Sequence, residues 1–242
     1  MPPGRGTDDR RRDPGAGRAD PALGGARDPV TRRRRAAPGT AAAPSGLGPP
    51  LPRAFYERPA PVVARALLGC LLVSRLGGRT TAGRIVETEA YLGPEDGASH
   101  AAFRPSSFDL FYGPGGHAYV FRAYGVHLCL NAIAGAAGTP GCVLIRAVAP
   151  VRGEAAMRRR RGQNLGQRGR RRLTDGPGKV TQALAISLGE NGADLTRGPL
   201  TIRVARSGRF VVASGPRIGI SRARSRRLRF WIRDNLDVSP AR

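Results

Sequence analysis

Residues 80–91, TTAGRIVETEAY, predict a long β-strand, and the rest of the fold is interpreted outward from it. The apolar run at residues 71–73 predicts a preceding strand, and Gly77-Gly78 predicts the turn that joins the two. Because side chains alternate along a strand, one face of the long strand carries four of them. They are Ile85, Glu87, Glu89 and Tyr91.

The two carboxylates on this face have two interpretations. Burial between apolar neighbours would be costly for them, so a solvent-facing strand with both glutamates paired to arginines is the simpler one. The other interpretation is a pocket in which the environment tunes the pKa of one carboxylate for general-base catalysis. Spacing alone does not decide between them.

Further elements follow on both sides of this strand. Pro59 and Pro61 fit the first turn of a helix that Gly69 ends. A helix is also expected over residues 180–188, and strands are expected over 118–133, 142–148, 200–204, 210–213 and 228–232. Strands dominate, with helices between them. This pattern predicts an α+β domain built on a mostly antiparallel sheet.

Residues 1–50 differ in composition from residues 51–242. They hold nine of the 21 prolines, nine of the 34 glycines and no aromatic residue, so they cannot bury enough apolar surface to offset the entropy of ordering. We expect a disordered Arg/Pro/Gly-rich arm at 1–50 and one folded domain at 51–242. The arm is either an inert tail or a weak tether for phosphate groups.

The charge of the chain limits its function. Its 41 basic and 17 acidic residues give a formal net charge of +24, which favours nucleic acid or an anionic membrane surface as partner. Residues 158–172 alone hold eight arginines and no acidic residue. This segment is either a solvated loop or a contact to a phosphate backbone. The sequence contains neither a transmembrane stretch nor a secretory signal, so a cytoplasmic protein is expected. Three cysteines without a C-x-x-C pair argue against a disulfide scaffold or a zinc site.

Aromatic residues gather in the segment 117–125, HAYVFRAYG. Tyr119 and Phe121 are most simply core residues, whereas Tyr124 beside Gly125 fits the tip of a hairpin, where an exposed ring could act as a wedge between bases. Asn131 follows in an apolar run and must find hydrogen-bond partners if it is buried. It is either a satisfied structural amide or a group that lines a site.

Six tracts stand in one order and together resemble the alkyladenine (3-methyladenine) DNA glycosylase family, the monofunctional base-excision type of mammals and bacteria. The tracts are FYERPAPVVARALLGCLLV (55–73), GRIVETEAYLGPEDGASHA (83–101), GPGGHAYVFRAYGVHLCLN (113–131), CVLIRAVAP (142–150), LTDGPGKVTQALAI (173–186) and PRIGIS (216–221). The resemblance covers about residues 54–239. It implies a compact single α+β domain with a curved antiparallel sheet and a protruding hairpin that inserts into DNA.

The resemblance also implies an activity. Members flip a damaged purine out of double-stranded DNA and hydrolyse its N-glycosidic bond, which starts base excision repair. No metal or organic cofactor is implied, and we expect a monomer. By motif, Glu89 matches the residue that activates water and Arg146 an arginine near that water.

The remaining motif positions fall around the base and the DNA backbone. Tyr91 matches a residue that stacks on the flipped base, and His100 and Phe121 border the same pocket. Asn131 matches a residue that helps to exclude normal guanine. The wedge corresponds to Tyr124, and a position near the DNA backbone corresponds to Lys179.

Two departures from the family pattern bear on specificity. Phe121 stands where a tyrosine is usual, and residues 101–112 replace a tract that normally contacts DNA. A non-catalytic damaged-DNA-binding protein therefore stays an alternative. A glycosylase with lyase activity is a third interpretation, and it would need Lys179, the sole lysine, as an amine nucleophile.

Overall fold

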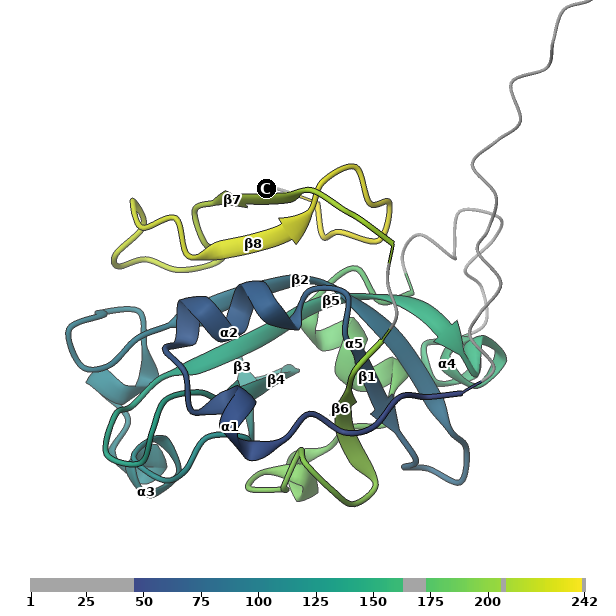
Figure 1. Cartoon of the computed structure of the whole chain (residues 1–242), viewed down its shortest axis with the longest axis horizontal. Helices are drawn as coiled ribbons and strands as arrows, with labels where there is room; N and C mark the ends of the chain where they lie inside the picture. The colour runs from purple at the N-terminus through teal and green to yellow at the C-terminus, as the bar shows by residue number, and fades with distance from the viewer. Residues whose placement is uncertain (1–45, 163–172, 206–207, 241–242) are drawn as a thin grey trace, which may run out of the picture. The chain divides into compact units, whose positions relative to one another are not determined.

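The strand at residues 81–91 lies at the centre of a curved, half-barrel sheet (Figure 1). The computed structural model describes residues 46–162, 173–205 and 208–240, and in these ranges eight antiparallel strands form one sheet. Their bounds are β1 Leu71–Ser74, β2 Thr81–Tyr91, β3 Ala118–Ala123, β4 His127–Ile133, β5 Cys142–Arg152, β6 Leu200–Arg203, β7 Val212–Gly215 and β8 Arg229–Ile232. The order is β3-β4-β5-β2-β1-β6, and the β7–β8 hairpin joins through β8 to β2.

Strand β2 has partners on both edges. It pairs with β5 along its length, while its other edge is shared between β1, which pairs with residues 81–84, and β8, which pairs with residues 87–89. The register places Glu89 between Leu144 of β5 and Arg229 of β8. Irregularities in the β2–β5 ladder flank Glu87. A bulge of this kind re-aims side chains locally.

Short helices cover parts of the sheet. The helices are α1 Arg53–Tyr56, α2 Ala60–Leu67, α3 Phe108–Phe111, α4 Glu154–Arg160 and α5 Pro177–Ala183, with 3-10 turns at His100–Ala102, Pro105–Ser107 and Leu188–Glu190. Helix α2 packs on β2 and β5 and buries Val63, Ala64 and Leu67, and α5 packs on β4 and β5 (Figure 1). The Thr88 hydroxyl of β2 donates to the backbone oxygen of Ala64 at 2.9 Å, which fixes α2 against the strand.

Strands β3 and β4 form a tight hairpin, with Ala123 paired to His127 at its end. The turn holds Tyr124 at φ 51° and Gly125 at φ 72°, both in the left-handed region. Glycine adopts that region freely, whereas it is strained for a tyrosine. The sequence predicts strand over 118–133 with a tip at Tyr124, and the structure divides this stretch into two strands there.

The expected α+β class and the antiparallel sheet are confirmed. The helix expected over 180–188 is wrong at both ends, because α5 begins at Pro177 and ends at Ala183, and Ala185 at φ 57° takes the left-handed conformation that closes the helix. The strand expected at 210–213 is shifted to 212–215. None of the helices in the described part of the chain is long and apolar enough to cross a membrane.

The N-terminal segment is described only from Gly46. Residues 1–45, which make up most of the expected arm, lie outside the described residues, as do residues 163–172 of the arginine-rich loop. Within the expected arm, Pro50 forms a β-bridge to Arg203 of β6, and the Gly48 carbonyl accepts a hydrogen bond from the Arg203 guanidinium at 2.9 Å. The last residues before Leu51 thus pack on the sheet.

Candidate active site

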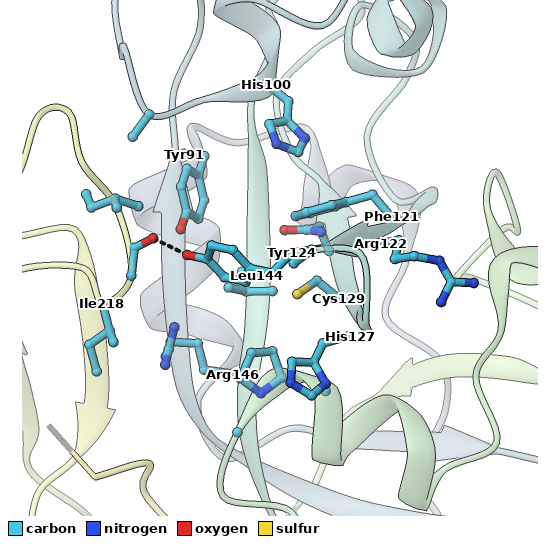
Figure 2. Close-up of a pocket in the computed structure, with 18 of the residues that line it drawn as sticks. Tyr91, His100, Phe121, Arg122, Tyr124, His127, Cys129, Leu144, Arg146 and Ile218 are labelled. Atoms are coloured by element: carbon cyan, nitrogen blue, oxygen red, sulfur yellow. Dashed lines mark hydrogen bonds between the residues drawn. The ribbon is translucent and has the colours of Figure 1, made fainter. Parts of the chain in front are cut away.

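A pocket with a volume of about 1070 Å³ opens beside the ends of β2, β3 and β4 (Figure 2). It brings together residues from five of the six tracts singled out in the sequence; residues 55–73 do not line it. The predicted site residues that line it are Tyr91, His100, Phe121, Tyr124, Asn131, Arg146 and Lys179. Glu89, the eighth, has no exposed surface and lies directly behind the wall of the pocket.

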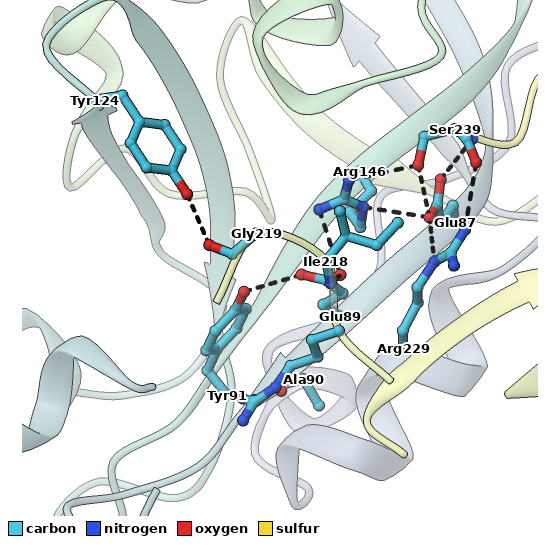
Figure 3. Close-up of polar contacts among 11 residues, drawn as sticks. Glu87, Glu89, Ala90, Tyr91, Tyr124, Arg146, Ile218, Gly219, Arg229 and Ser239 are labelled. Atoms are coloured by element: carbon cyan, nitrogen blue, oxygen red, sulfur yellow. Dashed lines mark hydrogen bonds and ion pairs between the residues drawn. The ribbon is translucent and has the colours of Figure 1, made fainter. Parts of the chain in front are cut away.

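Glu87 is buried and accepts hydrogen bonds from four donors (Figure 3). Its Oε1 atom accepts from Arg146 Nε at 3.2 Å, from Arg229 Nε at 2.6 Å and from the Ser239 hydroxyl at 2.9 Å. Its Oε2 atom accepts from the backbone N–H of Ser239 at 2.8 Å. Three donors thus hold Oε1 and one holds Oε2, and one of the partners, Arg229, does not line the pocket.

Glu89 is equally buried but less occupied. Its Oε1 atom accepts from the backbone N–H of Ile218 at 2.8 Å and faces the Arg146 guanidinium at 3.3 Å, while Oε2 accepts from the Tyr91 hydroxyl at 2.9 Å (Figure 3). With two hydrogen bonds and one ion pair among the described residues, and only the Tyr91 hydroxyl on Oε2, one acceptor position on Oε2 stays open. All three partners line the pocket, so the open position lies next to it.

Burial sets the ionisation behaviour of this carboxylate. It raises the pKa of Glu89 above its ordinary value near 4.5, against the opposing pull of Arg146 and the hydrogen bonds from Ile218 and Tyr91. The neighbouring Glu87 adds to the rise. For Arg146, burial alone would lower the pKa, but Glu89 and Glu87 outweigh it and raise the pKa, so the guanidinium stays charged. A carboxylate in this setting binds a proton more readily than an exposed one.

The side chains of Tyr91, His100 and Phe121 line the pocket (Figure 2). The rings of His100 and Phe121 lie 4.4 Å apart, and Phe121 in turn stacks on Tyr119 at 5.3 Å. The Nδ1 atom of His100 is 2.6 Å from the Tyr119 hydroxyl. Burial, with a contribution from Arg104, lowers the pKa of His100 to about 4, so the imidazole is neutral at pH 7. Together these rings form an apolar slot in which a planar base could lie.

Asn131 is buried on β4 and satisfies both descriptions that the sequence left open. Its amide nitrogen donates to the Tyr119 backbone oxygen at 3.1 Å, and its oxygen lies 3.8 Å from the Cys142 sulfur. The amide also lines the pocket. Asn131 is therefore both a buried amide with hydrogen-bond partners and a residue that lines the pocket.

Tyr124 stands at the tip of the β3–β4 hairpin with 80% of its surface exposed. Its only hydrogen bond within the described residues is from its hydroxyl to the Gly219 backbone oxygen, at 2.7 Å (Figures 2 and 3). Both residues line the pocket. The expected exposure of this ring is confirmed, and the ring is not part of the hydrophobic core.

Related sequences show the family to which the chain belongs. A profile of the methylpurine-DNA glycosylase family matches residues 54–236. The chain belongs to this family. The chain is similar to a protein of Methanoculleus marisnigri, 42% identical over 193 residues, which cover 78% of this chain and 98% of that protein. It is also similar to proteins of Rhodopseudomonas palustris HaA2 (41% identical, 83% of this chain and 95% of the relative) and Myxococcus xanthus (42%, 78% and 93%). All three are named, provisionally, 3-methyladenine DNA glycosylases.

In this methylpurine-DNA glycosylase family member, Lys179 lies in α5 at the edge of the pocket. Its Nζ atom is 2.6 Å from the Asp175 carboxylate, one helical turn earlier, and its side chain is 35% exposed. The amine is therefore paired with a carboxylate and partly accessible. A nucleophilic lysine has to be free to attack, whereas this one is held by the Asp175 carboxylate.

The family member also contains a buried ion pair to which the sequence analysis gave no role. Arg217 and Asp96 form two hydrogen bonds, of 2.6 and 2.7 Å, and neither side chain is exposed. Arg217 also donates to the Ala90 backbone oxygen at 3.0 Å, and the next residue, Ile218, gives its N–H to Glu89. This pair thus fixes the loop that supplies one donor to Glu89. The only signal in the sequence was the position of both residues inside recognisable tracts, GPED and PRIGIS.

Proposed function

We propose that this protein is a DNA repair glycosylase that removes damaged purines from double-stranded DNA by hydrolysis. The relatives' names and the family support a glycosylase acting on methylated purines. The observation that carries the proposal is the open acceptor position on buried Glu89, next to a slot lined by aromatic side chains. A base extruded from DNA needs an aromatic slot to bind in. The water that takes the place of the base on the sugar needs a carboxylate to accept its proton.

In the proposed reaction, a water bound at Oε2 of Glu89 attacks the anomeric carbon of the flipped nucleotide. The bond between that carbon and the purine nitrogen breaks, its electron pair leaves with the purine, and the proton of the water passes to Glu89. The carboxylate also stabilises the positive charge that develops on the sugar, as in other glycoside hydrolases. Arg146 lies between the two glutamates at 3.2 and 3.3 Å and holds Glu89 in place.

The other residues bind the DNA. Tyr91, His100 and Phe121 stack around the base, and Asn131 limits which purines fit. Tyr124 is the wedge that fills the gap in the base stack, supported by its exposure at a hairpin tip. Lys179 and the many arginines contact phosphate groups, and the arm at residues 1–50 adds a weak, sequence-independent tether. The protein acts as a monomer.

The test is base release under single-turnover conditions. Duplexes that hold hypoxanthine, ethenoadenine, 3-methyladenine or 7-methylguanine are incubated with excess protein, and free base is measured. We expect release of at least one lesion and none from undamaged DNA. Binding to a lesion without release would favour the alternative, a non-catalytic damage-binding protein.

A second arm of the test addresses lyase activity. Borohydride traps the Schiff base that an amine nucleophile forms with an abasic site. We expect base release without a trapped adduct, because Lys179 is engaged by Asp175. A covalent adduct that disappears in Lys179→Gln would make the protein a bifunctional glycosylase.

A further inference from the structure

The loop at residues 216–221 is held in place by side-chain contacts. Strand β7 ends at Gly215, so this loop lies beyond the sheet. The Arg217 side chain has no exposed surface, and its guanidinium donates to the Asp96 carboxylate at 2.6 and 2.7 Å and to the Ala90 backbone oxygen at 3.0 Å. These three hydrogen bonds tie the loop to β2 and to the turn that follows β2.

Asp96 accepts hydrogen bonds from four donors. Besides the two from Arg217, the backbone N–H of Leu92 donates to Oδ2 at 3.1 Å and that of Ala98 to Oδ1 at 3.3 Å. Burial raises the pKa of Asp96, but these hydrogen bonds outweigh burial and lower the pKa overall, so the carboxylate is ionised at neutral pH. Asp96 therefore joins the turn after β2 to the loop through a buried, charged contact.

Both neutral donors to Glu89 depend on the place of Arg217. Ile218, the next residue in the chain, gives its backbone N–H to Oε1 at 2.8 Å (Figure 3). The other neutral donor is the Tyr91 hydroxyl, 2.9 Å from Oε2, and the Arg217 guanidinium carbon lies 4.6 Å from the centre of the Tyr91 ring. A displacement of Arg217 would thus move the donors to both oxygens of Glu89.

We infer that Asp96 is a positioning residue for the proposed reaction, because through Arg217 it fixes the two neutral donors that orient Glu89. The inference rests on the proposed function, in which Glu89 activates water. Neither Asp96 nor Arg217 lines the pocket, so the pair acts through the residues it holds. The two donors contact different oxygens of Glu89 and so set the direction of its open acceptor position. A misplacement of about 1 Å in such a group can slow a reaction by about 10²-fold.

The experiment uses the full-length protein and the duplex lesion that the wild type releases fastest. Arg217→Lys is the first variant, because lysine keeps the positive charge that faces Asp96 and removes the forked contact. In single-turnover base release, the amplitude reports the active fraction and the rate constant reports the chemistry of the active molecules. We expect the rate constant to fall at least about tenfold, while lesion binding changes by less than about threefold.

Two further variants accompany it. Asp96→Asn keeps the size of the side chain and removes its charge, and it should lower the rate constant in the same direction if Arg217→Lys does not fold. Asp194→Asn is the matched control, because Asp194 forms an ion pair with Arg53 at 2.8 Å and does not line the pocket. The control should lower the melting temperature and leave the rate constant unchanged.

The pH dependence of the rate constant separates positioning from loss of the fold. Burial raises the pKa of Glu89, and the hydrogen bonds from Ile218 and Tyr91 oppose that rise. With these donors displaced, Glu89 binds a proton more readily, so the rise of the rate with pH should move to higher pH in Arg217→Lys. The charged and titratable groups around Glu89 are Glu87 and Tyr91 on its own strand, Cys129 on β4, Arg146 on β5, Arg217 in the loop and Arg229 on β8. Arg217→Lys changes the charge of none of them, and a smaller folded fraction would change only the amplitude.

A wild-type rate constant in Arg217→Lys, or in Asp96→Asn if the first variant does not fold, would overturn the inference. So would a rise of the rate that stays at the wild-type pH or moves to lower pH in Arg217→Lys, or an equal slowing in Asp194→Asn. These results would leave the proposed function intact, since the wild type would still release the base. If the wild type releases no base from any lesion, the proposed function fails and the inference fails with it.

Discussion

Replacing Glu87 and Glu89 separately by glutamine should produce opposite phenotypes, although the two residues lie on the same strand and share Arg146. Glutamine keeps the size of the side chain and removes the charge. At Glu89 it removes the proposed base, so single-turnover base release should fall by at least about 10²-fold. Lesion binding should persist, because the slot and the wedge are untouched.

The stability of Glu89→Gln follows from the sign of its pKa shift. Burial raises the pKa of Glu89, so the folded state binds a proton more readily than the unfolded state does. The ionised carboxylate therefore destabilises the fold as pH rises from about 4.5 through the raised pKa. Above that window the neutral amide avoids this cost. The melting temperature of Glu89→Gln at pH 7 should equal or exceed that of the wild type.

Glu87→Gln should do the reverse. It leaves the buried cation Arg229 without its carboxylate and Arg146 with Glu89 alone, and breaking such a buried network typically costs about 3–5 kcal/mol. For a folded part of this size, about 2–4 °C per kcal/mol, the melting temperature should fall by about 6–20 °C. The molecules that stay folded should retain much of the activity.

Thermal melts and single-turnover base release on both variants, with the active fraction measured by lesion binding, decide the assignment. Full activity per folded molecule in Glu89→Gln, together with an inactive but stable Glu87→Gln, would refute it. In that case the open acceptor position on Glu89 is not the site where water is activated.

Three further predictions address the wedge, the arm and the pH dependence. Tyr124→Ala should change the melting temperature little, because the ring is 80% exposed, but should slow excision, most for stably paired lesions and least for mismatched ones; a large fall in melting temperature with normal activity would return the ring to the core. Deleting residues 1–45 removes ten arginines and five aspartates, a net charge of +5, so binding to undamaged DNA should weaken. The slope of the logarithm of the binding constant against the logarithm of the salt concentration should become shallower by about 0.9 for each phosphate that the arm neutralises. The single-turnover rate should be unchanged. The rate of base release should rise with pH through an apparent pKa above 4.5, because Glu89 must be ionised to act. His100→Gln should keep this rise, since the pKa of His100 is lowered to about 4. If the rise disappears in that variant, it belongs to His100.

Most of the residues of the candidate site and much of the sheet could be predicted from the sequence. Alternation along 80–91 placed Glu87 and Glu89 together, and both contact Arg146 in the structure. The tip at Tyr124 was visible because Gly125 follows it. Both predictions depend on residues adjacent in the chain. Such local preferences are kept in the folded protein when the packing of neighbouring elements favours the same conformation.

What escaped prediction depends on partners distant in the chain. Spacing could not tell that Glu87 is the structural carboxylate, because Ser239, which gives it two hydrogen bonds, lies 152 residues away. The same holds for Asp96 and Arg217, 121 residues apart. The end of α5 was missed for another reason: the apolar period continues past Ala183, and the left-handed backbone of Ala185 leaves no trace in a residue type that favours helix.

Because β2 is paired along both edges, the catalytic carboxylate proposed here sits where hydrogen exchange should be slowest. Its backbone is held by β5 on one side and by β1 and β8 on the other, so no local opening frees it without separating the sheet. The tip of the β3–β4 hairpin, at Tyr124 and Gly125, has no such protection. Local opening at the hairpin tip would therefore weaken contacts with DNA before it disturbed the carboxylate. On heating, discrimination between damaged and undamaged DNA should be lost first and base release second.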